Sequence, residues 1–305
     1  MSSDRIASVT VSQNVLRDIT ESFASVQRTG EELSSGKAIA QPSDNPFGAA
    51  RAIELQSTLD GLSSYATNVQ EALAWQSTAT GSLTSIGQVV ARAREIALQS
   101  GSGIDNKEEL AMLGGSIEQL TEQVKADANA KYAGEYIFSG TKSTTAPYQT
   151  GAEDAYQGNG ETVARSIAPG MSVGLGVNIS ELLGSGAPAA DGKLLDVLRT
   201  IAKELKEGTP EALQAVRTSG LEGLERAEVK LDQMQSHMGV ITDQLRAAEG
   251  SIEAMRTTTT AALAGTTEVN FARAATEYST QQVAYEAAMR AGSSIIQMSL
   301  LNFLH

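Results

Sequence analysis

Apolar residues recur at intervals of three and four along most of this chain, which is the spacing that places them on one face of a helix. The pattern holds over residues 1–41, 47–146 and 211–305, and none of these stretches contains Pro. A Pro inside a helix removes a backbone donor and clashes with the preceding turn, so the three stretches are free to form long helices. The sequence therefore predicts a mainly α protein.

Both ends of the chain carry apolar rows with a seven-residue spacing, which is typical of helices that pack along a partner helix. The N-terminal rows are Val9, Leu16 and Phe23, and Ile19, Val26 and Leu33. The C-terminal rows are Phe271, Tyr278 and Tyr285, and, less regularly, Ala275, Met289, Ile296 and Phe303. We expect the two ends to pair as a coiled coil.

The ends are also poor in charge. Residues 1–48 hold four basic and six acidic side chains, and residues 266–305 hold two and three. A helix that is apolar on more than one face is normally buried on several sides, so these helices should bind further copies of the chain. The candidate assembly residues are Val9, Leu16, Ile19, Phe23, Val26, Phe271, Tyr278, Tyr285, Met289, Ile296, Leu300 and Phe303. The alternative is a seam internal to one chain.

Helical periodicity is lost between residues 136 and 190, where Gly and Pro become frequent. Two short alternating segments, 162–167 and 172–177, predict strands joined at Pro169-Gly170. We expect a small β-rich insertion that projects from the helices, so that 143–188 could be replaced by a short linker.

Two local patterns predict helix starts. Asp105 with Glu108 resembles a capping box, and Thr209 precedes Pro210 at a first helical position. The predicted fold is an elongated helical rod with paired terminal coiled-coil helices and a small inserted β-rich domain. Its parts are a terminal assembly domain (1–45 and 266–305), a helical rod domain (46–135 and 191–265) and an outer domain (136–190).

Composition limits the function. The chain has 305 residues, a net charge of −13 and no Cys, so a disulfide framework is excluded and binding to nucleic acid or an anionic membrane is disfavoured. The N-terminus has no apolar leader, and no stretch approaches the roughly 18 apolar residues of a membrane-spanning helix. We expect a cytoplasmic protein or one exported without leader cleavage.

Catalytic patterns lack support. Only His237 and His305 are present as histidines, and without Cys the usual zinc and Cys/His sites are missing. The segment from Gly30 to Lys37 resembles a phosphate loop, but its glycine spacing is wrong and Ala38 replaces the magnesium-binding hydroxyl. We predict no catalytic residue, no cofactor and no metal.

Three sequence blocks resemble the bacterial flagellin superfamily. Leu33-Ser-Ser-Gly-Lys-Ala-Ile followed by Gln41-Pro-Ser-Asp-Asn-Pro-Phe-Gly-Ala-Ala resembles its N-terminal signature, and Ser299-Leu-Leu-Asn-Phe-Leu resembles its C-terminal end. Tyr136-Ile-Phe-Ser-Gly-Thr-Lys, with Pro147-Tyr148 after it, is more similar to the hook–filament junction (hook-associated) branch than to flagellin itself.

The resemblance implies a structural protein of the bacterial flagellum, not an enzyme. Such proteins pair their chain ends inside a hollow filament and are exported unfolded through the flagellar channel without a cleaved signal peptide. The implied partners are further copies in a ring or tube, other hook-associated proteins, flagellin, the export apparatus and an export chaperone. The implied location is the extracellular hook–filament junction.

Two other functions stay open. A minor flagellin would form the filament itself and would polymerise into long filaments instead of stopping after a ring. A cytoplasmic coiled-coil signalling adaptor would predict an unbroken heptad hairpin, whereas this sequence interrupts its helices with a β-rich segment.

Overall fold

The structure is a computed structural model that describes residues 2–100, 106–152 and 154–303, with the side chains of 2–9, 11–12 and 295–303 outside this description. The fold is mainly α, as the sequence predicts, and contains two small antiparallel sheets. The chain forms two compact units. A terminal unit comprises residues 1–61 and 254–305, and a central unit comprises residues 62–253.

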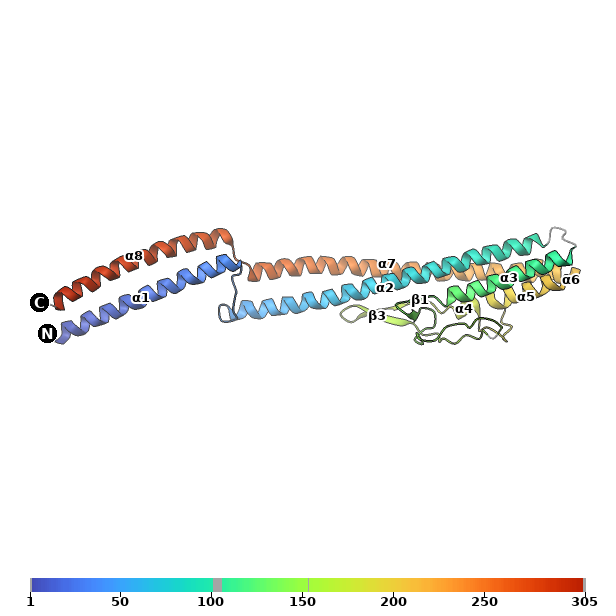
Figure 1. Cartoon of the computed structure of the whole chain (residues 1–305), viewed down its shortest axis with the longest axis horizontal. Coiled ribbons are helices and arrows are strands. Elements are labelled where there is room, and N and C mark those ends of the chain that lie inside the picture. The colour runs from blue at the N-terminus through green and yellow to red at the C-terminus, as the bar shows by residue number, and fades with distance from the viewer. Residues whose placement is uncertain (1, 101–105, 153, 304–305) are drawn as a thin grey trace. The chain divides into compact units, whose positions relative to one another are not determined.

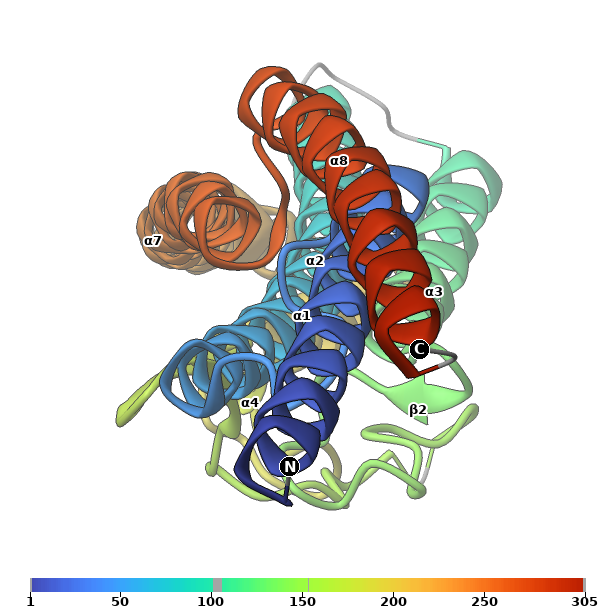
Figure 2. The same ribbon diagram turned by 90° about the vertical axis from the view of Figure 1, so that its left-hand side faces the viewer.

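The terminal unit is organised around the two ends of the chain. Helix α1 (Ser2–Ser35) and helix α8 (Phe271–Phe303) lie side by side, which both views show (Figures 1 and 2). The first turns of α2 (Pro46–Gln99) and the last turns of α7 (Leu221–Thr267) complete the unit. The predicted pairing of the terminal helices is confirmed.

The central unit has a core of long helices with regular seven-residue rows. Helix α2 buries Leu62, Val69, Gln76, Leu83, Val90 and Ala97, and helix α7 buries Leu224, Leu231, Met238, Leu245 and Ile252. Helices α3 (Lys107–Ala128) and α5 (Leu194–Glu207) pack against each other and add to the same core. Long helices form here because each presents an apolar stripe to the others, which Gln76 interrupts on α2.

The helix starts agree with the sequence at one site and differ at another. Thr209 caps α6 (Pro210–Ala215), since its side chain accepts a hydrogen bond from the Ala212 N–H and Pro210 occupies the first turn. A π-helical turn, η1 (Val216–Gly220), then leads into α7. The cap of α3 is Asn106, which accepts from the Glu108 N–H at 3.0 Å, so the prediction of Asp105 as the cap was wrong. Asp105 itself lies outside the described residues.

The β-rich segment contains two hairpins. Strands β1 (Lys131–Tyr132) and β2 (Glu135–Tyr136) pair at the end of α3, ahead of the predicted insertion. Strands β3 (Val163–Ala168) and β4 (Met171–Leu175) pair antiparallel with the turn at Pro169-Gly170, as predicted. Gly170 has a φ of +72°, a conformation that favours glycine. A short helix, α4 (Ser180–Leu183), follows.

This segment, residues 131–191, is packed into the core of the central unit, and we call it the lobe. Tyr148 is fully buried, and its hydroxyl donates a hydrogen bond to the Gly184 carbonyl at 2.6 Å. Burial raises the pKa of the Tyr148 phenol far above its ordinary value. Ile179 and Leu183 are also buried in the shared core. The expectation of a replaceable projection was therefore wrong, because 143–188 supplies core side chains.

A buried group of charges ties the lobe to the helices. Asp154 accepts hydrogen bonds from the Ala187 N–H at 2.7 Å and from Arg199 Nη2 of α5 at 3.0 Å. Lys125 Nζ of α3 lies 3.3 Å from Asp154 Oδ2 and donates to the Gly151 carbonyl at 2.8 Å. We call Asp154, Lys125 and Arg199 the Asp154 cluster. Because Asp154 and Lys125 are nearly fully buried, this cluster holds the lobe in one position.

Within the part of the chain that the structure describes, no helix is long and apolar enough to cross a membrane.

Candidate assembly interface

Helices α1 and α8 meet along a seam with alternating spacings of four and three. On α1 the seam positions, all partly or fully buried, are Val15, Ile19, Ser22, Val26, Thr29 and Leu33; Ser25, Gly30 and Glu32 beside them are also partly buried. On α8 they are Ala274, Tyr278, Gln281, Tyr285, Ala288 and Gly292. This is the spacing of a two-helix coiled coil.

Small residues let the two helices approach closely. A Cβ atom at Gly292 would lie 2.8 Å from Ile19 Cδ1, and one at Gly30 would lie 3.3 Å from Tyr278 Cε2. Thr29 Oγ1 lies 2.7 Å from Gln281 Oε1, so a hydrogen bond crosses the seam. The seam is therefore filled by small and polar residues together with Ile19, Val26 and the two Tyr rings.

The structure separates the predicted assembly residues into three groups. Ile19, Val26, Tyr278 and Tyr285 lie in the seam. Leu16, Phe23, Phe271 and Met289 keep 56%, 45%, 59% and 47% of their surface exposed. The side chains of Val9, Ile296, Leu300 and Phe303 lie outside the described residues.

Two of the predicted heptad rows are therefore displaced by one residue. The seam uses Val15, Ser22 and Thr29 in place of Leu16 and Phe23, and Ala274, Gln281 and Ala288 in place of Ala275 and Met289. Bulky side chains would hold the helices apart, so the smaller neighbours occupy the contact. The predicted row Ile19, Val26 and Leu33 lies in the seam, and so do Tyr278 and Tyr285, whereas Phe271 of their predicted row is exposed.

Four of the predicted assembly residues are therefore exposed apolar side chains, and we call them the outer row: Leu16 and Phe23 of α1 with Phe271 and Met289 of α8. The Phe23 ring centroid lies 5.6 Å from that of Tyr285, so Phe23 borders the seam directly. Exposed apolar area of this kind favours association, since each Å² removed from water contributes about 25 cal/mol.

A tight connection fixes the end of this helix pair. Gly36 adopts a φ of +70°, and its carbonyl accepts a hydrogen bond from the Val269 N–H at 3.0 Å. The Ala38 N–H donates to the Thr267 carbonyl at 2.8 Å. The α1–α2 and α7–α8 connections are thus joined by backbone hydrogen bonds, which sets the register of α1 against α8.

Residues 41–48, which in the sequence served only as part of the family resemblance, form a hydrogen-bonded corner before α2. Asp44 accepts from the Gln41 N–H at 2.7 Å, and Asn45 accepts from the Gly48 N–H at 2.9 Å at the start of α2. Gly48 faces inward, because a Cβ there would lie 2.6 Å from Ile39 Cδ1. Its neighbour Phe47 consequently points outward and is 87% exposed.

Phe47, and Ile53 farther along α2, were missed as candidate interface residues. Both are large, apolar and exposed in the terminal unit. The sequence feature that could have indicated Phe47 is the pair of small residues after it. Gly48 and Ala49 are buried, which leaves the adjacent Phe47 facing solvent.

Several charged side chains pair with one another within α1 and within α8. Arg17 and Glu21 form an exposed pair at 3.9 Å, and Arg273 hydrogen-bonds Glu277 at 2.8 Å. The hydrogen bond to Glu277 raises the pKa of the Arg273 guanidinium. Exposed pairs of this kind contribute little to stability, so the chemistry that this surface offers is apolar packing.

Limited proteolysis of the purified monomer is expected to remove both ends and leave a stable fragment of about residues 45–265. Among the described side chains, α1 buries only Thr29, and α8 buries only Ala274 and Gly292. So little apolar burial leaves the helix pair marginally stable without a neighbour. Mass spectrometry of the fragment locates the cuts, and full protection of the ends in a monodisperse monomer would contradict the expectation.

Comparison with known proteins agrees with this arrangement. The bacterial flagellin N-terminal helical region matches residues 6–143, and the C-terminal helical region matches residues 221–304. Flagellar hook-associated protein 3 of Escherichia coli (strain K12) is 24% identical over 310 residues, covering 94% of this chain and 97% of that protein. The flagellar filament 33 kDa core protein of Treponema phagedenis is 24% identical over 294 residues, covering 94% and 95%.

The fold also has a solved counterpart. The flagellar junction protein from Legionella pneumophila superposes with a TM-score of 0.57 at 15% identity, covering 71% of this chain and 99% of that one. The two matched helical regions together span more than half of the sequence and contain both helices of the seam. The chain therefore belongs to the bacterial flagellin family.

Proposed function

We propose that this chain is a structural protein of the bacterial flagellum that joins the hook to the filament by self-assembly through its terminal helices. The observation that carries the proposal is the outer row, a set of exposed apolar side chains on a helix pair whose own seam is already filled. The similarity to hook-associated protein 3, which extends over nearly the full length of both chains, supports the proposal.

The proposal assigns assembly to the terminal domain, residues 1–45 and 266–305, including Val9, Ile296, Leu300 and Phe303. Residues 46–135 and 191–265 form the supporting helical domain, and 136–190 the outer domain. The partners are further copies in a ring or tube, other hook-associated proteins and flagellin. Export through the flagellar apparatus, with a chaperone and without leader cleavage, follows from the same proposal and gives an extracellular location.

A second candidate is a minor flagellin. The nearly full-length similarity to the Treponema phagedenis filament core protein favours it, because that protein is named as part of a filament. The two functions differ in extent of assembly: a junction protein stops after a short ring, whereas a flagellin continues into a long polymer.

Deletion of the gene distinguishes the two functions. Cells without the junction protein are expected to carry hooks that lack filaments and to secrete unpolymerised flagellin, because the growing filament has no base. Electron microscopy of cells and immunoblotting of the medium measure both effects, and restoring the wild-type gene is the control. Normal filaments in the deletion strain would contradict the junction function.

A further inference from the structure

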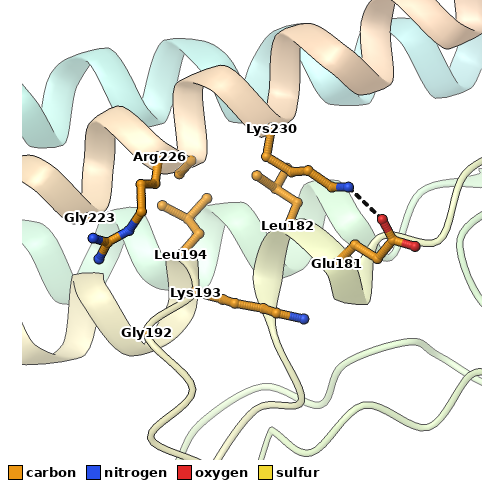
Figure 3. Close-up of a pocket in the computed structure, with 9 residues that line it drawn as sticks. Glu181, Leu182, Gly192, Lys193, Leu194, Gly223, Arg226 and Lys230 are labelled. Atoms are coloured by element: carbon orange, nitrogen blue, oxygen red, sulfur yellow. Dashed lines mark hydrogen bonds and ion pairs between the residues drawn. The ribbon is translucent and has the colours of Figure 1, made fainter.

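A pocket of about 390 Å³ lies on the central unit between α7, α4 and the start of α5. Its charged lining is Lys193, Arg226, Lys230 and Glu181, so basic side chains outnumber acidic ones by three to one. Leu182 and Leu194 give the pocket an apolar base. Figure 3 shows Arg226 and Lys230 extending from α7 toward the segments that carry Glu181 and Lys193. In a chain of net charge −13, this is a local reversal of sign.

The backbone beside Lys193 is held in place. Asp191 accepts hydrogen bonds from the Ser185 N–H at 2.9 Å and the Lys193 N–H at 3.1 Å. Asp196 accepts from the Gly192 N–H at 2.9 Å. The carboxylates of Asp191 and Asp196 thus already accept hydrogen bonds from backbone N–H groups.

The three basic side chains of the pocket differ in the partners that they already have. Lys230 Nζ lies 2.5 Å from Glu181 Oε2, and Lys193 Nζ donates to the Ser180 carbonyl at 3.0 Å. No described carboxylate lies within ion-pair distance of Arg226. A guanidinium presents a planar fork of donors that matches the two oxygens of a carboxylate, so Arg226 is the group that an incoming acid would engage.

We propose that this pocket receives an Asp or Glu side chain from a second copy of the chain, with Arg226 as the principal contact and Lys193 and Lys230 beside it. The inference rests on the proposed function, which requires copies to pack against one another. Identical chains that each carry 36 acidic and 23 basic residues repel unless basic groups of one face acidic groups of the next. The pocket supplies such a place on the central unit.

The test uses two isotopic forms of the full-length chain, one with natural nitrogen and one with ¹⁵N, mixed before assembly. A water-soluble carbodiimide then joins lysine amines to carboxylates in direct contact, and mass spectrometry identifies the linked peptides. We expect Lys193 and Lys230 to be joined to acidic peptides of the other isotopic form. A same-label link between Lys230 and Glu181 is the internal control for reactivity.

Substitution provides a second readout. Arg226→Gln is expected to raise the concentration of half-association about fivefold or more, with a weaker salt dependence than wild type. Arg246→Gln is the matched control, because Arg246 is an exposed Arg on the same helix outside the pocket. Sedimentation velocity at several protein and salt concentrations measures both variants.

Two results overturn the inference separately from the proposed function. One is mixed-label crosslinks elsewhere in the assembly but none at Lys193 or Lys230. The other is Arg226→Gln behaving like Arg246→Gln while both associate normally. A wild-type chain that does not self-associate under any condition contradicts the proposed function itself, and the pocket inference with it.

Discussion

Replacing Phe23 with Asp is expected to abolish incorporation into the flagellum while leaving the chain folded and exported. Phe23 belongs to the outer row and keeps nearly half of its surface exposed, so a carboxylate there is solvated in the monomer. In the assembly the same carboxylate would be buried without a partner, at a cost of several kcal/mol per contact. Leu16→Asp should act in the same way, because Leu16 lies one heptad before Phe23.

Two comparison variants make this result specific. Asn14→Asp adds the same charge to an exposed position of α1 outside the outer row and should incorporate normally. Val26→Asp places the charge in the seam between α1 and α8, so it should disrupt the helix pair itself. Secretion is measured by immunoblot, incorporation by electron microscopy and helicity by circular dichroism. Normal incorporation of Phe23→Asp would show that the outer row is not part of the assembly interface.

Replacing Asp154 with Ala is expected to destabilise the central unit by roughly 1–3 kcal/mol, because it removes one of the two carboxylates paired with Lys125 and leaves the Ala187 N–H without its acceptor. Lys125 has only 2% of its side chain exposed, so without Asp154 its ammonium group depends on the Glu122 carboxylate and the Gly151 carbonyl. The lobe is also released from α5, since Arg199 loses its acceptor. Chemical denaturation followed by circular dichroism measures the change.

Lys206→Met is the matched control for the Asp154 cluster. Lys206 of α5 pairs with Glu118 of α3 at 2.6 Å, but both side chains are about half exposed. Exposed pairs contribute about 0–1 kcal/mol, so this variant should remain close to wild type. Equal effects of the two substitutions would show that burial of the Asp154 cluster does not determine its contribution.

The Asp154 cluster also explains why linker replacement of residues 143–188 is no longer expected to preserve the fold. The replacement would remove Asp154 together with Tyr148 and Ile179, all of which are buried. Gly and Pro content indicated a loosely attached segment, whereas the contacts with α3 and α5 are made by single residues widely spaced in sequence. No periodic pattern marks such contacts, and the sequence therefore gave no sign of them.

The sequence by itself determined the helices, the hairpin at Pro169-Gly170, the Thr209 cap and the pairing of the chain ends. These features depend on local rules: Pro excludes helix, Gly permits a positive φ, and a seven-residue spacing places side chains on one face. Such rules act over a few residues, so they can be read without knowing the partner.

Only the tertiary structure decided which side of each terminal helix faces the other. Adjacent residues of a helix differ by about 100° in direction, so a displacement of one residue moves Phe23 out of the seam and Ser22 into it. Close approach at Gly30 and Gly292 selects that rotation, and the two glycines lie on helices at opposite ends of the chain. The Asp154 cluster likewise joins residues from three separate segments. Contacts of this kind are fixed by packing across the fold, which a local pattern does not contain.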